Sequence, residues 1–405
     1  MKKLMICLVS LFVAVVFTVP AAAAEKTVSS ECDITDVSVP IAATGAAAKF
    51  GEKLDIKAKS AILLEPNTHE VLYESNSDEK LPPASITKIM SLLLIMEAID
   101  RGDLKVEDVV NASAHAASMG GSQIWLKENE AMTVDDLLKA AVIASANDAT
   151  VALAEAVAGS EEGFVDLMNE KAQALGLSGT VFKNATGLDA KGHVSTARDV
   201  AVISAELIKH PLIKNYSTVW MDTLRDGKSE LVNTNKLVRF YNGTTGLKTG
   251  TTANAGYCLA ATAKRKGMEL VAVIMGGETS AARFEGAKKL LDYGFSNYSF
   301  EKIKPEFKNG TKISVKGGTE KSVQLEAKGE CSFLKRKSEN AEISQNVNLA
   351  KSVSAPVKKG DKVGEIEIFS GETAVGKVDI IAKRSVTRMR PATALLWLLK
   401  GLFTA

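Results

Sequence analysis

The chain has 405 residues, 46% of them hydrophobic, and its formal net charge at neutral pH is only +2. A chain of this length buries enough apolar surface for a globular protein of about two domains. A charge balance so close to neutral gives no basis for nucleic-acid binding, which depends on clustered positive charge. We therefore expect a globular protein that does not bind nucleic acid.

Residues 1–24 have the pattern of a secretory signal peptide. Lys2 and Lys3 precede an apolar run, and the small residues Ala22–Ala24 form a cleavage site before Glu25. An uncleaved N-terminal anchor is the alternative. Residues 25–54 are small and polar, and they predict a mobile leader. The protein is thus expected to be exported and to act outside the cytoplasm.

Three cysteines remain after the signal peptide: Cys32, Cys258 and Cys331. Their odd number and wide spacing match neither a disulfide framework nor a metal site. A bond between Cys32 and Cys331 stays open. The mature protein is not expected to depend on disulfides.

Residues 55–298 predict an α+β domain. A hairpin comes first, followed by a buried helix, a helical middle, three strands and a last helix. The hairpin covers 60–65 and 70–75, and the buried helix covers 86–99. The helices of the middle are 133–143, 147–157, 160–176 and 196–207. The three strands are 244–251, 256–264 and 268–275, and the last helix is 281–295. Thr133 with Asp136, and Thr196 with Asp199, predict capping boxes. The economical assembly is one antiparallel sheet flanked by helices, with the first hairpin beside the late strands.

Residues 299–384 differ in character, because short alternating strands are separated by Gly, Lys and Glu. They predict a small all-β domain. Residues 385–405 join several basic residues to the apolar segment Ala394–Leu399, which is too short to cross a bilayer. This pattern predicts an amphipathic helix held at a membrane surface. A helix docked on the β-domain is the alternative.

The predicted buried helix carries a serine and a lysine at its start. Pro82 and Pro83 allow a helix only after them, and the residues that follow are apolar on nearly every face. Ser85 and Lys88 are three residues apart, so they share one face. A buried lysine next to the positive end of the helix dipole tends to be neutral, and it can then act as a base for a serine nucleophile. Alternatively, Ser85 caps the helix while Lys88 reaches the surface.

A second motif, Ser145-Ala146-Asn147, lies at the break between two predicted helices. Two side chains two residues apart in a turn can point into one cleft, where Ser145 would relay a proton and Asn147 would bind a carbonyl. An ordinary turn with a helix cap is the alternative for this motif on its own.

The third motif, Lys248-Thr249-Gly250, lies in a predicted strand. Lys248 and Thr249 can bind a carboxylate, and Gly250 lets a ligand lie close to the backbone. The N–H of Thr251, with that of Ser85, would form an oxyanion hole. The alternative is a basic strand end before a turn.

The three motifs together, in this order, are typical of penicillin-binding proteins and β-lactamases. The chain resembles the low-molecular-mass penicillin-binding proteins, specifically the D-alanyl-D-alanine carboxypeptidases of peptidase family S11. The resemblance runs from about Asp55 to the C-terminus and includes the stretches 60–64, 83–88, 195–199, 248–252 and 275–277. Ala146 departs from the common second motif, but both functional side chains remain.

The resemblance implies a serine β-lactamase/DD-peptidase-like fold with a β-rich C-terminal domain and an amphipathic anchor at the outer face of the cytoplasmic membrane. Ser85 would attack the bond between the two D-alanines that end a peptidoglycan stem peptide, and Lys88 would take its proton. Ser145 and Lys248 would carry the proton onward. Asn147 would hold the peptide carbonyl or orient Lys88.

The resemblance also implies that Lys248 and Thr249 bind the terminal carboxylate of the substrate. β-Lactams would acylate Ser85 as substrate mimics. No metal ion and no organic cofactor is expected.

Three other functions remain open. A class A β-lactamase uses a glutamate after the second motif, and none occurs between Glu170 and Glu206. A D,D-endopeptidase shares all three motifs. A non-catalytic envelope protein that binds peptidoglycan or β-lactams would usually have lost the serine or a lysine.

Five further residues are candidates for structural or cleft positions. His193 is expected to be structural rather than a base, and Arg198 with Asp199 to form an ion pair or cap. Trp220 and Tyr241 lie either in the cleft or in the core.

Overall fold

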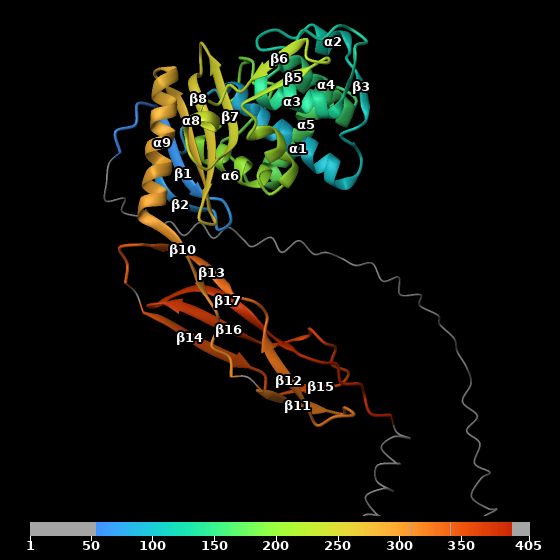
Figure 1. Cartoon of the computed structure of the whole chain (residues 1–405), viewed down its shortest axis with the longest axis vertical. Helices are drawn as coiled ribbons and strands as arrows, with labels where there is room; N and C mark the ends of the chain where they lie inside the picture. Colours follow the sequence, from blue (N-terminus) through green and yellow to red (C-terminus); the bar gives the residue numbers. More distant parts are fainter. Residues whose placement is uncertain (1–53, 309, 341, 391–405) are drawn as a thin grey trace, which may run out of the picture. The chain divides into compact units, whose positions relative to one another are not determined.

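The computed structural model describes residues 54–308, 310–340 and 342–390 (Figure 1). The predicted signal peptide, almost all of the predicted leader, Cys32 and the apolar part of the C-terminal tail lie outside these residues. The expectations for them therefore stay predictions. No helix within the described ranges combines the length and the apolar character needed to cross a membrane.

The first domain is built on one five-stranded sheet with the order β2-β1-β9-β8-β7, in which all neighbours are antiparallel. The strands are β1 (Ser60–Glu65), β2 (Glu70–Ser75), β7 (Thr244–Thr252), β8 (Gly256–Arg265) and β9 (Met268–Gly277). Because β1 pairs with β9, the N-terminal hairpin lies beside the late strands, as predicted. β7, which carries the third motif, is an edge strand.

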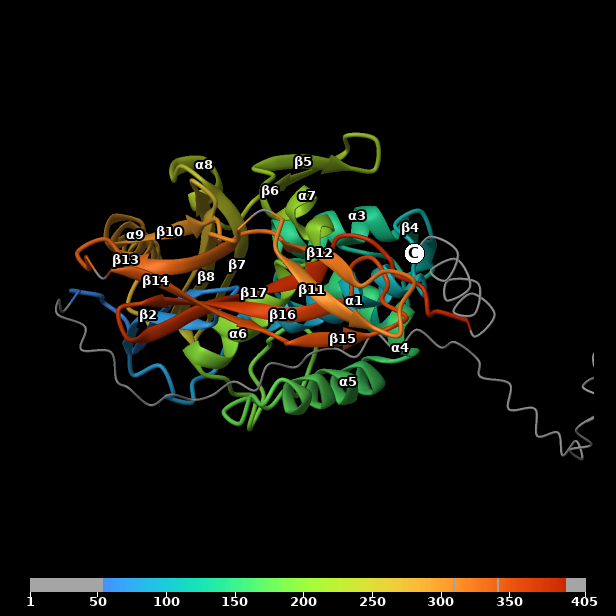
Figure 2. The same cartoon turned by 90° about the horizontal axis from the view of Figure 1, so that it is seen from below.

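Alternate residues of β1 point into two different cores, as the two-residue period of a strand requires. Ile62 and Leu64 belong to the core beneath the helical middle. Ala61 and Leu63 belong to the core beneath α9 (Ser280–Asn297). Figures 1 and 2 both draw α9 on the face of the sheet opposite the helix α1. The predicted α+β arrangement, an antiparallel sheet flanked by helices, is thus confirmed.

The helical middle consists of the predicted helices with small changes at their ends. They are α1 (Lys88–Arg101), α3 (Val134–Lys139) continued by the wide turn η2 (Ala140–Ala144), α4 (Asn147–Ala158), α5 (Glu161–Ala174) and α6 (Ala197–Leu207). The hydroxyls of Thr133 and Thr196 accept the N–H of Asp136 and Asp199, as expected of N-caps. The predicted capping boxes are nevertheless incomplete, because neither carboxylate returns a bond to its cap residue. That of Asp199 is used elsewhere, as described below.

Several short elements were not predicted. They are η1 (Ala84–Thr87), β3 (Val109–Asn111), α2 (Ala114–Ala117), β4 (Ala131–Thr133), η3 (Pro211–Ile213), α7 (Lys214–Ser217), β5 (Met221–Leu224), β6 (Ser229–Val232) and α8 (Leu237–Phe240). Each is too short to have a hydrophobic period of its own.

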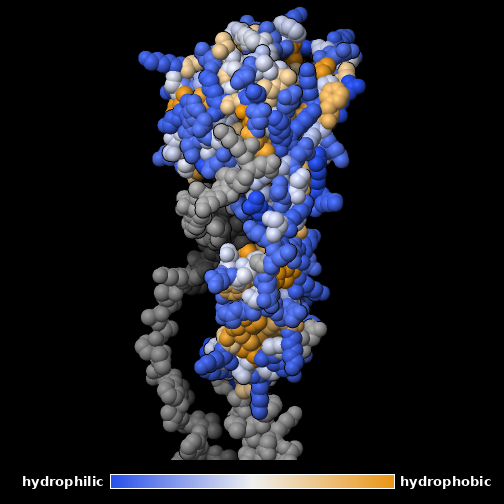
Figure 3. Space-filling view, turned by 90° about the vertical axis from the view of Figure 1, so that its left-hand side faces the viewer, coloured by the Kyte–Doolittle hydropathy of each residue, from blue (hydrophilic) through white to orange (hydrophobic). Residues whose placement is uncertain are grey.

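Among the described residues, the chain from Tyr298 to Arg390 has strands and no helix, so it is all-β, as predicted. One two-stranded sheet pairs β10 with β13, and a six-stranded sheet has the order β14-β16-β17-β12-β11-β15. The strands are β10 (Tyr298–Ile303), β11 (Lys312–Lys316), β12 (Ser322–Ala327), β13 (Cys331–Arg336), β14 (Ile343–Leu349), β15 (Ser352–Ser354), β16 (Lys362–Ser370) and β17 (Thr373–Ala382). They enclose a separate apolar core that contains Ile366, Ile368 and Ile380. On the face drawn in Figure 3 the surface is mostly hydrophilic, with apolar side chains gathered in a few limited areas.

Candidate active site

The first motif lies where a tight turn passes into a buried helix. Pro82 and Pro83 lead into the 3₁₀ turn η1, and α1 begins at Lys88. The preceding residue Leu81 exchanges two backbone hydrogen bonds with Ser195, of 2.8 and 2.9 Å. These bonds hold the approach to Ser85 against the segment that precedes α6. A helix after the two prolines was predicted, and the structure adds the turn η1 between Pro83 and α1.

The Lys88 amine is fully buried and has three polar neighbours. Its Nζ lies 3.1 Å from Ser85 Oγ, 2.6 Å from Asn147 Oδ1 and 2.8 Å from the carbonyl oxygen of Thr186. Lys88 therefore does not reach the surface, and the interpretation of Ser85 as a simple helix cap is wrong. Ser85 Oγ makes no cap hydrogen bond in η1.

Burial lowers the pKa of Lys88 well below its usual range, and the neighbouring Lys248 lowers it further, whereas Asp148 acts in the opposite direction. A neutral amine has two N–H donors and one lone pair. Asn147 Oδ1 and the Thr186 carbonyl oxygen can only accept, so they take the two donors. The lone pair is then left for the hydroxyl of Ser85.

Asn147 is fixed in orientation at the start of α4. Its Nδ2 donates to the carbonyl oxygen of Gly120 at 2.6 Å, and its backbone N–H donates to Ser122 at 2.6 Å. The amide oxygen consequently faces Lys88. Of the two roles expected for Asn147, the contact present here is the one that orients the lysine.

The next residue, Asp148, was not singled out from the sequence. Its buried carboxylate accepts the N–H groups of Ile124 and Leu126, at 3.0 Å to Oδ2 in each case. It thereby holds the segment that supplies Gly120 and Ser122. A carboxylate beside the second motif is visible in the sequence, but its backbone partners are not.

Ser145 ends the turn η2 with a left-handed backbone (φ 64°) and is buried. Within the described residues its hydroxyl makes no hydrogen bond to Lys88 or Lys248. The proton-relay role of Ser145 therefore stays a prediction.

The third motif lies on β7, directly against the turn that bears Ser85. A Cβ atom built on Gly250 would lie 2.8 Å from the backbone nitrogen of Ser85 and 3.0 Å from the carbonyl oxygen of Pro83. Glycine is therefore required here for the close approach of two backbone segments. The first and third motifs are brought together as predicted.

Lys248 is buried beside this contact. Burial lowers the pKa of Lys248 to about 7, and the nearby guanidinium of Arg283 contributes to the shift. Its Nζ donates to the carbonyl oxygen of Thr249 at 3.2 Å. The hydroxyl of Thr249 donates to that of Thr234 at 2.7 Å. Of the two side chains expected to bind a carboxylate, Lys248 is thus buried near Arg283, and Thr249 is hydrogen-bonded to Thr234.

Arg283 on α9 was missed in the sequence. Its Nη1 donates to the carbonyl oxygen of Gly250 at 3.0 Å and to Thr251 Oγ1 at 2.9 Å, and its side chain is buried. No carboxylate in the described part of the chain pairs with it. Nothing in a sequence marks one arginine of a helix as buried behind a strand, so no local signal pointed to it.

The segment 183–193 supports Lys88 from the other side. Asn184 Oδ1 accepts the N–H of Gly187 at 2.7 Å. Gly187 has φ +87°, and a Cβ atom there would lie 1.9 Å from the carbonyl oxygen of Ala84. The segment is thus seated on the nucleophile turn, with the carbonyl of Thr186 aimed at the lysine.

His193 is structural, as predicted. Burial lowers its pKa to about 4, so the ring is neutral. Nδ1 accepts the N–H of Lys183 at 3.4 Å, and Nε2 lies 2.9 Å from Thr87 Oγ1. The ring therefore joins the supporting segment to the residue before Lys88.

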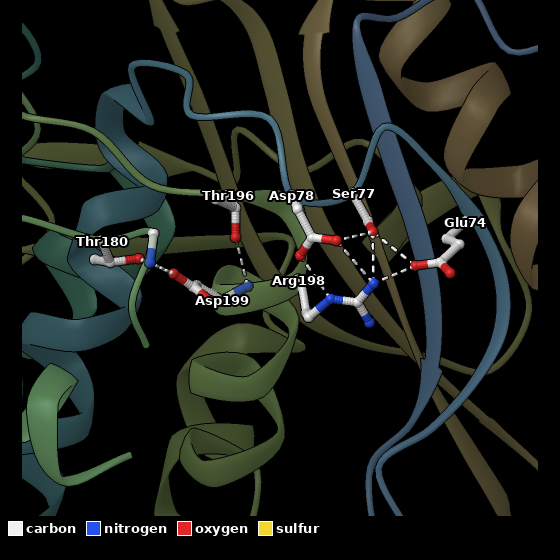
Figure 4. Close-up of polar contacts among 8 residues, drawn as sticks. Glu74, Ser77, Asp78, Thr180, Thr196, Arg198 and Asp199 are labelled. Carbon is white, nitrogen blue, oxygen red and sulfur yellow. Dashed lines mark hydrogen bonds and ion pairs between the residues drawn. The ribbon is translucent and has the colours of Figure 1, made fainter. Parts of the chain in front are cut away.

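Arg198 and Asp199 tie separate segments to the start of α6 (Figure 4). Arg198 donates to Asp78 at 2.7 Å, to Ser77 Oγ at 2.8 Å and to Glu74. Arg198 thus forms ion pairs, but with Asp78 and Glu74 rather than with Asp199.

Asp199 accepts the N–H of Gly179 at 3.0 Å and the hydroxyl of Thr180 at 2.6 Å (Figure 4). Asp199 is thus bonded to residues 179–180 rather than to a cation. Arg198 in turn anchors the strand β2 and the segment that leads to Ser85.

Trp220 and Tyr241 pack on other side chains. The Trp220 ring lies 6.1 Å from that of Phe240, and Tyr241 donates its hydroxyl to Asp292 at 2.6 Å. Neither contacts a residue of the three motifs through a hydrogen bond. In the residues that the structure describes, no three His, Cys, Asp or Glu side chains are grouped so as to hold a metal ion.

Comparison with known proteins finds matches for both parts of the chain. Residues 45–279 match the D-alanyl-D-alanine carboxypeptidase family (peptidase family S11), and residues 300–388 match the C-terminal domain of penicillin-binding protein 5. The D-alanyl-D-alanine carboxypeptidase DacF of Bacillus subtilis (strain 168) is 43% identical over 344 residues, which cover 84% of this chain and 88% of that protein.

Two crystal structures are similar to more than half of this chain. Penicillin-binding protein 5 from Haemophilus influenzae has a TM-score of 0.69 and 30% identity, covering 83% of this chain and 99% of its own. Penicillin-binding protein D2 from Listeria monocytogenes in its ampicillin-bound form has a TM-score of 0.55 and 33% identity, covering 60% and 100%. With the buried Ser85–Lys88 pair, these matches show that the chain belongs to the D-alanyl-D-alanine carboxypeptidase family, as a serine-type enzyme.

Proposed function

We propose that this enzyme removes the terminal D-alanine of peptidoglycan stem pentapeptides through an acyl-enzyme on Ser85. The observation that carries the proposal is the buried Lys88 amine, whose two donors are taken by Asn147 and Thr186 and whose lone pair is left for Ser85 Oγ. An amine in this state can accept the serine proton at neutral pH.

In the acylation step, Ser85 Oγ forms a bond to the carbonyl carbon between the two D-alanines, and its proton passes to Lys88 Nζ. The carbonyl oxygen becomes an oxyanion that the N–H groups of Ser85 and Thr251 would stabilise. The contact of Gly250 with the Ser85 nitrogen supports this, because it sets the two backbones side by side. The C–N bond then breaks, and D-alanine leaves after its nitrogen receives a proton through Ser145 and Lys248.

The free carboxylate of the terminal D-alanine would bind Lys248 and Thr249. A substrate carboxylate stabilises the charged form of Lys248, which burial alone disfavours. A peptide that continues past this position would place a neutral amide there and leave Lys248 unpaired. This difference accounts for cleavage at the chain end.

Water then hydrolyses the ester and restores Ser85. β-Lactams would acylate the same oxygen, since their amide is opened by the same attack. The ampicillin-bound relative supports this step. Rapid turnover of penicillin would instead indicate a β-lactamase, and cleavage of cross-linked peptides would indicate an endopeptidase.

The test is incubation of the mature protein with a peptide that ends in D-Ala-D-Ala, followed by measurement of free D-alanine. We expect release by the wild type and none by Ser85→Ala. Ser178→Ala, at an exposed serine without a side-chain hydrogen bond, is the matched control and should behave as wild type. Fluorescent penicillin should label the peptide that contains Ser85. Wild-type rates in Ser85→Ala would contradict the mechanism.

We also propose that the protein is exported and held at the outer face of the cytoplasmic membrane by residues 385–405. The support is the signal-peptide pattern and the basic, Trp-containing apolar tail. Deletion of residues 386–405 should move the protein from the membrane to the soluble fraction while D-alanine release stays within about twofold, because a surface anchor contributes no group to the site. Continued membrane association of the signal-cleaved, tail-less form would contradict this location.

A further inference from the structure

A cavity of about 220 Å³ adjoins the nucleophile turn, and none of the three motifs lines it. Pro82, Pro83 and Ala84 form one wall, residues 187–191 form another, and Asn254 lies at the end of β7. Pockets for whole small molecules measure about 300–1,000 Å³. This one is of a size to hold a single side chain of a longer ligand.

The path of the substrate leads to this cavity, an argument that rests on the proposed function. With the terminal carboxylate at Lys248 and Thr249 and the reacting carbonyl at Gly250, the rest of the peptide runs along the free edge of β7 toward Thr252. An extended peptide advances about 3.3 Å per residue. The residue before the two D-alanines therefore lies one residue, about 3.3 Å, beyond the D-alanine whose carbonyl reacts, toward the end of β7 and Asn254.

The cavity is lined by two side chains of opposite charge, Asp189 and Lys191. Thr252 Oγ1 donates to Asp189 Oδ1 at 2.7 Å, which leaves the other carboxylate oxygen free. Lys191 is two residues further on, and both side chains are exposed. Neither forms an ion pair within the described residues. The third ionisable lining residue, His193, is neutral and hydrogen-bonded to its own segment.

We propose that this cavity binds the side chain of the residue that precedes the two D-alanines, with Asp189 on its ammonium and Lys191 on a carboxylate beside it. A side chain that ends in both groups is that of meso-diaminopimelate. The substrate class is thus stem peptides with this diamino acid, in preference to those with lysine, which offers the ammonium alone.

The experiment compares three synthetic peptides that end in D-Ala-D-Ala and differ only in the preceding residue: meso-diaminopimelate, L-lysine or Nε-acetyl-L-lysine. The full-length protein is used, and kcat/KM is obtained from D-alanine release. Exposed ion pairs are weak, so we expect each step down this series to lower kcat/KM by about three- to fivefold. Equal values for the three peptides would overturn the subsite and leave the proposed function intact. No release from any of them would overturn the proposed function itself.

Two isosteric or near-isosteric variants separate the charges. Asp189→Asn keeps an oxygen for Thr252 but removes the negative charge, so the ratio between the lysine and acetyl-lysine peptides should fall to about one. Lys191→Gln should remove the preference for diaminopimelate over lysine. Asp166→Asn, at an exposed residue of α5 that makes no ion pair among the described residues, is the matched control and should keep all ratios. Wild-type ratios in Asp189→Asn would overturn its assignment.

Discussion

The active-site region and the C-terminal sheets differ in the polarity of their buried side chains. Among the residues that the structure describes, every buried polar or charged side chain lies between Ser60 and Arg283. The buried side chains of the C-terminal sheets are apolar residues and Cys331, and Lys362 and Lys377 form ion pairs at the surface.

This difference separates two kinds of electrostatic interaction. Lys88 and Lys248 are removed from water, which is unfavourable for their charged forms. Burial lowers the pKa of Lys88 well below its usual range and the pKa of Lys248 to about 7. The ion pairs of Lys362 and Lys377 remain exposed to water, and the hydrogen bonds of Lys377 and Lys362 lower the pKa of Glu365.

The largest effect is expected at Lys88. Lys88→Met keeps the volume but removes the base, so acylation of Ser85 by penicillin should slow by about 10²- to 10⁴-fold. The change in Tm should be small. Removing the amine removes the unfavourable free energy of burying it, and this offsets the cost of leaving the acceptors of Asn147 and Thr186 without a hydrogen bond. Stopped-flow acylation and calorimetry measure the two quantities. An acylation rate within a factor of two of the wild type would show that Lys88 is not the base.

A smaller effect is expected from pH through Lys248. Its lowered pKa of about 7 means that the amine is charged below this pH and neutral above it. Because the charged form binds the substrate carboxylate, KM should rise by up to about tenfold per pH unit above 7. The lowered pKa of Lys88 acts in the other direction, since protonation at low pH removes the base and reduces kcat.

The matched variant for this prediction is Lys248→Arg. A guanidinium stays protonated, so KM of the variant should no longer rise with pH, whatever its absolute value. The measurement is kcat and KM from pH 5 to 9 for both proteins. A wild-type KM that is flat above pH 7 would contradict carboxylate binding by a titrating Lys248.

The smallest effects are expected from ion pairs, and here the two regions can be compared directly. Arg198→Ala should lower the free energy of unfolding by about 1 kcal/mol, since the pairs with Glu74 and Asp78 are partly exposed. It should also slow acylation several-fold, because Arg198 anchors the segment that leads to Ser85. Arg198→Lys should recover part of both.

The counterpart in the C-terminal sheets is Lys377→Gln, which removes a lysine with two carboxylate partners, Glu365 and Glu367. This lysine is fully hydrated, so neither Tm nor the acylation rate should change measurably. A loss of activity as large as that of Arg198→Ala would remove the distinction between the regions.

Much of the fold was predictable because its elements have clear periods and boundaries. Thr133 and Thr196 cap helices as expected, and the strands β7, β8 and β9 lie within two residues of their predicted ends. The capping boxes failed at their second half, because the Asp199 carboxylate found stronger partners at Gly179 and Thr180. Those partners are about twenty residues away and leave no local trace.

Only the motif side chains of the site could be predicted from the sequence. Ser85, Lys88, Asn147 and Lys248 stand in recognisable motifs, and the structure brings them together. The groups that complete their surroundings were not predictable. The carbonyl of Thr186 is a backbone atom that any residue could supply, and Arg283 is one of many arginines.

The sequence by itself determined the family, the nucleophile, the lysine next to it and the change from a mixed domain to an all-β one, since these depend on spacing and period along the chain. The tertiary structure alone decided that the Lys88 amine meets two acceptors and has its third direction toward Ser85 Oγ, and that Gly250 and Gly187 bring two distant segments onto the Ser85 turn. The reason is physical: the pKa of an amine and the aim of its lone pair depend on burial and on neighbours from remote segments, and these exist only in the folded chain.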